Sequence, residues 1–296
     1  MNKGFIRMSG FAATLAVAIS FASPANALYN RDPGDGGSGT GGTGGVSTAP
    51  FTTRGACAPF AASSTVGANY RVSLAGFYVK TQTYDTILQT DGKGDEVFLS
   101  YKNVTMDSAG NVLTQGDNVT ATMGDTNGFA YREKAGSLSD LGGLQSEDCH
   151  HSTKTLWDGP LAAGQKAFIT PVMWEWDGGG DAWGTWTNWA SQLAGRVASK
   201  ASMFGPGAAN VISLVDIGLA GVASMPVGTA GDKQIGTVED STGRNFTPKM
   251  LTFDRTGADY VINNDAYGMG KGIVPVSYFG SNDNGLYTLY LRVQHS

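Results

Sequence analysis

Hydrophobic and polar residues alternate along several short stretches of the chain, and clusters of Gly, Asn, Asp and Ser separate these stretches. Alternation with a period of two is typical of β-strands with one buried face, and such clusters are typical of turns. The stretches with this pattern are residues 70–79, 96–102, 166–174, 235–238, 260–262 and 286–293. Short strands with frequent turns favour an all-β fold, and we expect an antiparallel β-sandwich.

One region departs from this pattern. Between residues 186 and 204 apolar residues recur at approximately helical spacing, and Gly205-Pro206-Gly207 interrupts the pattern. A second apolar stretch covers residues 208–225 and ends at Pro226. We therefore expect a helical hairpin over about 186–225, inserted in the β-protein, and helices mainly confined to it.

The N-terminus resembles an export signal. Lys3 and Arg7 precede an apolar run at residues 11–22, and Ala25-Asn26-Ala27 is an A-x-A cleavage site. We expect a signal peptide at 1–27, a flexible linker rich in Gly, Ser and Thr at 28–56, and a β-sandwich domain at 57–296. The signal predicts a secreted protein, in the extracellular space or the periplasm.

The composition excludes some partners. Charged residues make up 15% of the chain and the formal net charge is −5, whereas an average domain has about 25% charged residues. A net acidic chain without a basic cluster is a poor nucleic-acid binder. We expect no nucleic-acid partner, and the export signal excludes a cytosolic one.

Two cysteines, Cys57 and Cys149, are present. An even pair in an exported protein favours a disulfide. The alternative is that Cys149-His150-His151 forms a metal or redox cluster.

Acidic residues gather in one Gly-punctuated segment, residues 84–99. It contains Asp85, Asp91, Asp95 and Glu96, with Gly92 and Gly94 allowing tight curvature between the acids. Calcium prefers six to eight oxygen ligands, and carboxylates supply the charge that it needs. The alternative is that these acids belong to ordinary turns.

Two further acidic segments follow in the chain. Glu175 and Asp177 are two residues apart at a strand end, so they point to the same face; Asp181 comes shortly after, and Asp232 precedes the stretch at 235–238. We expect these acids to meet those of residues 84–99 at one end of the sandwich.

Residues 91–99, 172–177 and 232–236 resemble the calcium-binding loops of C2 domains. In that family two acids flank a turn before a strand, and two acids alternate around an aromatic residue; Glu175 stands where the family usually has Asp. The resemblance implies a C2-like eight-stranded sandwich with calcium as cofactor, and it makes the helical hairpin an insertion in the third loop. The ligands that we expect are Asp85, Asp91, Asp95, Glu175, Asp177 and Asp232, with Asp181 supplementary.

The sequence thus predicts a secreted calcium-binding module that acts in extracellular binding or structural stabilisation. Its partner would be an extracellular protein, a glycan or a membrane surface. One alternative is a membrane-active toxin or pore former, since Trp183, Trp186 and Trp189 lie in or beside the apolar hairpin. Another is a carbohydrate-active enzyme with paired carboxylates, although no common catalytic motif is present.

Overall fold

The computed structural model describes residues 50–83, 94–127, 132–176, 190, 213–216, 233–241, 243–281 and 284–296. The predicted signal peptide, and the predicted linker up to residue 49, lie outside these described residues.

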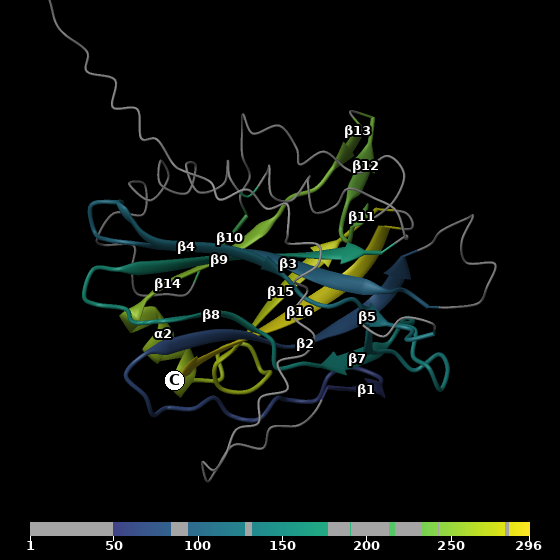
Figure 1. Cartoon of the computed structure of the whole chain (residues 1–296), viewed down its shortest axis with the longest axis horizontal. Coiled ribbons are helices and arrows are strands. Elements are labelled where there is room, and N and C mark those ends of the chain that lie inside the picture. Colours follow the sequence, from purple (N-terminus) through teal and green to yellow (C-terminus); the bar gives the residue numbers. More distant parts are fainter. Residues whose placement is uncertain are drawn as a thin grey trace, which may run out of the picture. The chain divides into compact units, whose positions relative to one another are not determined.

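The described residues form mostly β-structure in two large sheets (Figure 1). The first sheet has the order β1 (Phe51–Arg54), β7 (Asp148–His151), β2 (Tyr70–Thr83), β16 (Asn284–His295) and β15 (Ile273–Phe279), and β8 (Thr155–Gly159) also pairs with β2. The second sheet has the order β10 (Ser213–Asp216), β14 (Lys249–Asp254), β9 (Lys166–Glu175), β3 (Val97–Met106), β5 (Met123–Gly124) and β6 (Glu133–Lys134). Two more strands belong to it: β11 (Lys233–Gln234) pairs with β9, and β4 (Val112–Val119) pairs with β3. A separate hairpin joins β12 (Val238–Asp240) and β13 (Gly243–Asn245). The predicted β-sandwich architecture is therefore confirmed at this level.

The two sheets share one hydrophobic core. Strand β9 lies between β14 and β3 in the second sheet and is buried along nearly its whole length. Its Phe168 and Trp174 belong to the same buried cluster as Phe77 of β2 and Tyr287 of β16. Removal of this apolar area from water supplies the main driving force for the association of the sheets.

Four of the six predicted strand stretches lie mainly within strands: residues 70–79 in β2, 96–102 in β3, 166–174 in β9 and 286–293 in β16. The prediction for residues 235–238 is wrong, because only Val238 is in a strand and the chain turns between β11 and β12. Gly236 has a φ of +93°, and a Cβ there would overlap Tyr278. The close packing of this turn against β15 therefore requires glycine.

The prediction of a strand at residues 260–262 is also wrong. These residues lie in helix α2 (Arg255–Asn263), outside the range to which helices were expected to be confined. Asp254 caps the helix, since its Oδ1 accepts a hydrogen bond from the Gly257 N–H at 2.8 Å. Ala258, Val261 and Ile262 are buried at helical spacing, a period that three residues alone cannot reveal.

Most of the predicted helical hairpin, residues 186–225, lies outside the described residues. Within that range the structure describes Ala190, which is helical, and Ser213–Asp216. Ser213–Asp216 is strand β10 and pairs antiparallel with β14, so the second predicted helix is wrong at these positions. Pairing with the edge of β14 provides hydrogen-bond partners for the backbone N–H and C=O groups of these residues. A short apolar stretch is compatible with a strand or a helix, so its composition alone does not distinguish the two.

The N-terminal arm of the domain is held by β7. Strand β1 lies inside the range predicted as linker and pairs with β7 in the register Thr53↔Cys149. The predicted disulfide between Cys57 and Cys149 is confirmed, with a sequence separation of 92 residues.

We expect the disulfide to contribute about 2–5 kcal/mol to the free energy of unfolding, because it restricts a long loop in the unfolded chain. Urea unfolding of the wild type and of a Cys57→Ala/Cys149→Ala variant, each with and without reductant, measures this contribution. Reductant should destabilise only the wild type; equal stability of wild type and variant would contradict the prediction.

Candidate functional site

Of the predicted calcium ligands, Asp95 and Glu175 are described, and both are buried. Asp85, Asp91, Asp177, Asp181 and Asp232 lie outside the described residues. The described parts of the three acidic segments are therefore residues 94–99, 174–176 and 233–236.

The ends of the three acidic segments lie together at one end of the second sheet. Glu175 is the last residue of β9, and it is opposite Val97 of β3 on one side and Lys233 of β11 on the other. Asp95 comes two residues before Val97, and Lys233 directly follows Asp232. The described ends of the three segments are therefore neighbours, and the meeting of the acids themselves stays a prediction.

Hydrogen bonds link Asp95 and Glu175 through Thr83, the last residue of β2. Asp95 Oδ2 accepts bonds from the Thr83 backbone N–H at 2.8 Å and from the Tyr287 hydroxyl at 2.6 Å. The Thr83 hydroxyl donates to Glu175 Oε1. The donors belong to the first sheet, whereas Glu175 ends β9 of the second sheet and Asp95 lies two residues before β3 of that sheet, so this cluster connects the two sheets.

Gly94 allows the backbone next to Asp95 to pass close to Leu144. A Cβ at Gly94 would overlap the backbone carbonyl of Leu144, so the chain passes too close to this carbonyl for any other residue. Asp95 and Leu144 also exchange two backbone hydrogen bonds, of 2.7 and 3.1 Å. Gly94, which the sequence suggested as a point of curvature, is thus a point of close backbone approach.

The Tyr287 hydroxyl remains a donor over the whole physiological pH range. Burial, followed by the nearby charges of Asp95 and Glu175, raises the pKa of Tyr287 well above its usual value of 10.0. A protonated phenol next to a buried carboxylate offsets part of the desolvation that the carboxylate suffers.

Sequence reasoning missed Arg132, which lies at the same end of the sandwich. Its Nη1 lies 3.3 Å from Glu96 Oε1, and its Cζ lies 4.2 Å from the centroid of the Trp176 ring. Glu96 and Trp176 directly follow Asp95 and Glu175 in the sequence. A signal was present, because Arg132-Glu133-Lys134 is the one run of three consecutive charged residues in the chain.

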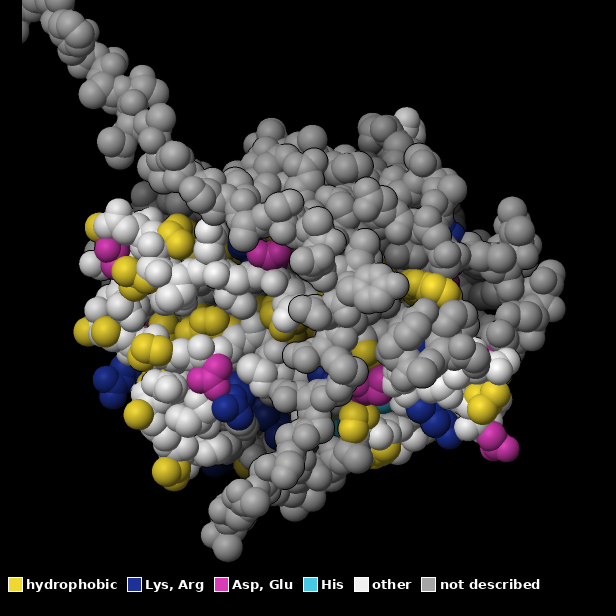
Figure 2. All heavy atoms as spheres, in the orientation of Figure 1, with side chains coloured by type: hydrophobic (Ala, Val, Ile, Leu, Met, Phe, Trp, Pro, Cys, Tyr) yellow, Lys and Arg dark blue, Asp and Glu magenta, His cyan; other side chains and the backbone are white. Residues whose placement is uncertain are grey.

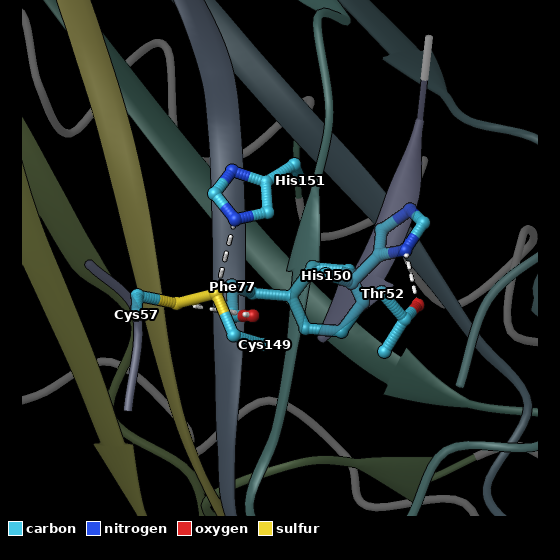
Figure 3. The surroundings of a disulfide bond; sticks show 6 residues. All are labelled: Thr52, Cys57, Phe77, Cys149, His150 and His151. Carbon is cyan, nitrogen blue, oxygen red and sulfur yellow. Dashed lines mark hydrogen bonds between the residues drawn. A yellow bond between two sulfur atoms is a disulfide. The ribbon is translucent and has the colours of Figure 1, made fainter. Parts of the chain in front are cut away.

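The Cys149-His150-His151 motif contacts the N-terminal arm of the domain, residues 51–57, and holds it against β7. Cys149 is bonded to Cys57, and His151 Nε2 lies 3.7 Å from Cys149 Sγ (Figure 3). The His151 ring also stacks on Phe51 of β1, with ring centroids 4.3 Å apart. Because Cys149 is in a disulfide, it is not available as a metal ligand, and the metal-cluster alternative for this motif is not supported.

The neighbouring His150 points to the opposite side of β7 and is fully buried. Its Nδ1 lies 2.9 Å from Thr52 Oγ1 of β1, and its Nε2 lies 3.5 Å from Glu133 Oε1 (Figure 3 shows the Thr52 contact). Lys154 Nζ lies 3.3 Å from the other oxygen of Glu133. Burial raises the pKa of Glu133, but the bond to His150 and the charge of Lys154 outweigh it, so the pKa lies below 4.5. This cluster joins β1, β6 and β7.

The donor chemistry at the end of the sandwich fits calcium. Asp95 and Glu175 supply carboxylate oxygens, and no His or Cys occurs in the three acidic segments, which disfavours zinc. Among the described residues, no three His, Cys, Asp or Glu side chains form a metal site by themselves. A complete calcium site would therefore need acids from beyond the described ends.

No protein-family model, curated protein or solved structure is detectably similar to this chain.

We expect Tyr287→Phe to lower the free energy of unfolding by about 1–3 kcal/mol, because it removes a donor from the buried Asp95 carboxylate. Denaturant unfolding measures the change. Tyr260→Phe is the matched control, since Tyr260 is half-exposed on α2 and should lose almost nothing. Equal effects of the two substitutions would contradict a special role for the Tyr287 hydroxyl.

We also expect a pH dependence that arises from His151. Burial, with the charges of His150 and Arg292, lowers its pKa below 6.5 in the folded protein. The unfolded chain therefore takes up a proton first as the pH falls, so stability is lost below about pH 6.5. His151→Phe keeps the stacking on Phe51 without the titration and should flatten this loss; Phe51→Leu should retain it. Unfolding curves measured across this pH range test the prediction, and identical slopes for wild type and His151→Phe would contradict it.

Proposed function

We propose that the protein is a secreted calcium-binding β-sandwich protein, with its metal site at the end where Asp95 and Glu175 meet. One observation carries the proposal: Glu175 pairs in register with Val97 and Lys233, and it is linked through Thr83 to Asp95. Residues that lie far apart in the sequence, each next to a segment rich in carboxylates, thus come together. Calcium is the common biological cation that such a set of oxygen ligands suits.

The residues have different roles in this proposal. Asp95 and Glu175 hold the ends of the acidic segments, because Thr83 and Tyr287 hydrogen-bond to them in the interior. Asp85, Asp91, Asp177 and Asp232 would add the further oxygens and the charge that calcium requires. When bound, the ion would offset the repulsion between these carboxylates and so stabilise the folded state.

The C2-like arrangement belongs to the same proposal. The resemblance of residues 91–99, 172–177 and 232–236 to C2 loops is supported by the position of their described ends at one end of a sandwich-like fold. The disulfide is consistent with an oxidising compartment, which supports secretion. We propose an extracellular protein, a glycan or a membrane surface as the partner of the calcium-bound form.

Charge is mixed on the described part of the face that Figure 2 presents, where Lys and Arg side chains are interspersed with Asp and Glu. Such a face favours neither sign of partner strongly.

Two alternatives receive less support than calcium binding. For the membrane-active protein, β10 falls inside the apolar stretch that suggested the second helix, and among the described residues no helix is long and apolar enough to cross a membrane. For the glycosidase, a catalytic carboxylate must reach the sugar. Asp95 and Glu175, however, are only 4% and 6% exposed and are hydrogen-bonded within the protein.

We expect calcium to raise the melting temperature of the metal-free protein. At a calcium concentration about 100 times the Kd, the rise should be roughly 5–10 °C by mass action. Thermal unfolding and titration calorimetry after treatment with a chelator measure both the rise and the affinity. Magnesium, which requires a smaller octahedral site, should have less effect.

An Asp91→Asn/Asp177→Asn/Asp232→Asn variant should lose the calcium effect, and its metal-free melting temperature should equal or exceed that of the wild type, because less repulsion between carboxylates remains. Asp107→Asn is the matched control, because Asp107 lies in an exposed turn at the opposite end of β3 and Asn can accept the same backbone hydrogen bonds. A wild type with no calcium response at millimolar concentrations would contradict the proposed function.

A further inference from the structure

We propose that strand β4 pairs with the β4 strand of a second copy of the chain, so that the second sheet continues from one copy to the other across a two-fold axis at Gly116. This contact would form a weak dimer. The inference concerns the backbone edge of β4 and does not depend on calcium binding.

Strand β4 presents an open backbone edge. It pairs antiparallel with β3 on one side, and among the strands that the structure describes none pairs with its other side. Six of its eight residues are exposed, including Val112 and Leu113 at 42% and 46%. Unpaired backbone N–H and C=O groups along such an edge are a template for pairing with another chain.

The other edge strands among the described residues are protected from such pairing. Strands β1 and β10 have four residues each, β8 has five, and β6 and β11 have two. Strand β15 has seven residues but contains Pro275, which has no N–H to donate. Short strands and proline are both devices that prevent association at a sheet edge. Strand β4 is longer and has no proline, so it is the edge best suited to accept a partner.

A hydrogen bond just beyond β4 establishes which of its residues face the open edge. The Thr120 N–H donates to the Leu99 carbonyl of β3 at 2.8 Å. Backbone groups alternate in direction along a strand, so those of Gln115 and Asp117, an odd number of residues before Thr120, point away from β3. Val119 also faces the open edge, but its N–H is already bonded to Asn118 Oδ1 at 2.8 Å. Gln115 and Asp117 are therefore the residues that would bond to a partner strand.

Charge favours one register for a second copy. With Gly116 opposite Gly116 of the second copy, Gln115 lies opposite Asp117 and Thr114 lies opposite Asn118, so no like charges face each other. Moving the axis to Asp117 would place two Asp117 carboxylates directly opposite, which destabilises a strand pair. Moving it to Gln115 would place Asp117 opposite Leu113, where the pairing of β4 with β3 is irregular. The sequence of β4 is thus self-complementary about Gly116.

The charge of Asp117 does not protect the edge in the way that an unpaired charge would. Lys102 is opposite Asp117 in the pairing of β3 with β4, and its Nζ lies 3.4 Å from Asp117 Oδ1. The Lys102 side chain is 6% exposed, so this cation is fixed on the β3 side of the pair. The middle of β4 therefore carries a compensated charge, and a polar side chain such as that of Gln115 can approach it.

Sedimentation velocity of the purified protein, from about 1 μM to 1 mM at low ionic strength, tests the proposal. We expect a dimer with a Kd on the order of 100 μM, because the interface is much smaller than that of a stable complex. Gln115→Glu places a carboxylate opposite Asp117 of the second copy and should raise the Kd roughly fivefold. Gln115→Lys places a cation there and should lower it by a similar factor.

Thr53→Glu is the matched control. Thr53 is an exposed residue of β1, at the edge of the first sheet, so the variant adds the same charge to an edge strand that the proposal does not use. Its Kd should equal that of the wild type. Amide hydrogen exchange provides a second readout, because the Gln115 and Asp117 amides should become protected as the protein concentration rises.

Three results would overturn the proposal. One is a wild type that stays monomeric up to 1 mM. Another is a dimer whose Kd responds in the same direction to Gln115→Glu and Gln115→Lys, since a two-fold pairing with Asp117 opposite Gln115 requires opposite responses. The third is a dimer that Thr53→Glu weakens and Gln115→Glu does not, which would place the contact at β1. None of these results bears on the proposed function, which the calcium titration decides separately.

Discussion

One end of the sandwich, called the acidic end here, is the place where Asp95 and Glu175 lie. It depends on hydrogen bonds that these two buried carboxylates accept from the other sheet. Glu175 ends β9 of the second sheet and Asp95 lies just before β3 of that sheet, whereas their donors Thr83 and Tyr287 come from the first sheet. Hydrophobic packing holds the sheets together but is not directional, so it leaves their relative position free to adjust. A buried carboxylate is stable only with its donors in place, and the cluster therefore specifies how the sheets meet at this end.

The position of Glu175 also determines which segments of the chain lie at the acidic end. Because Glu175 is opposite Val97 and Lys233, the sheet itself brings the ends of three acidic segments together. Arg132 places a positive charge beside them and stacks on Trp176. This end of the sandwich is where we propose that the protein binds calcium.

Strand β7 shows how a short polar strand can hold the N-terminal arm of a domain. Each of its four residues contacts a residue in or just after β1: Asp148 with Arg54, Cys149 with Cys57, His150 with Thr52 and His151 with Phe51. The contacts are of four different chemical kinds, namely an ion pair, a covalent bond, a hydrogen bond and ring stacking. This explains why Phe51–Arg54, inside a range with linker composition, is nonetheless a strand.

Local pattern determined the all-β class, the long strands and the cysteine pair, because period-two burial and an isolated pair of cysteines are properties of the chain itself. It also identified Asp95 and Glu175 as residues that belong together. It failed at residues 260–262, where the cap at Asp254 and burial against the core stabilise a helix. It also failed at Ser213–Asp216, where pairing with the edge of β14 stabilises a strand. The roles of the donors Thr83 and Tyr287 were equally beyond its reach, since their partners are distant in the sequence, whereas Arg132 stood in a visible run of charged residues whose partners only the structure shows. Backbone pairing and the satisfaction of buried charge are properties of the assembled sheets, so only the tertiary structure could decide them.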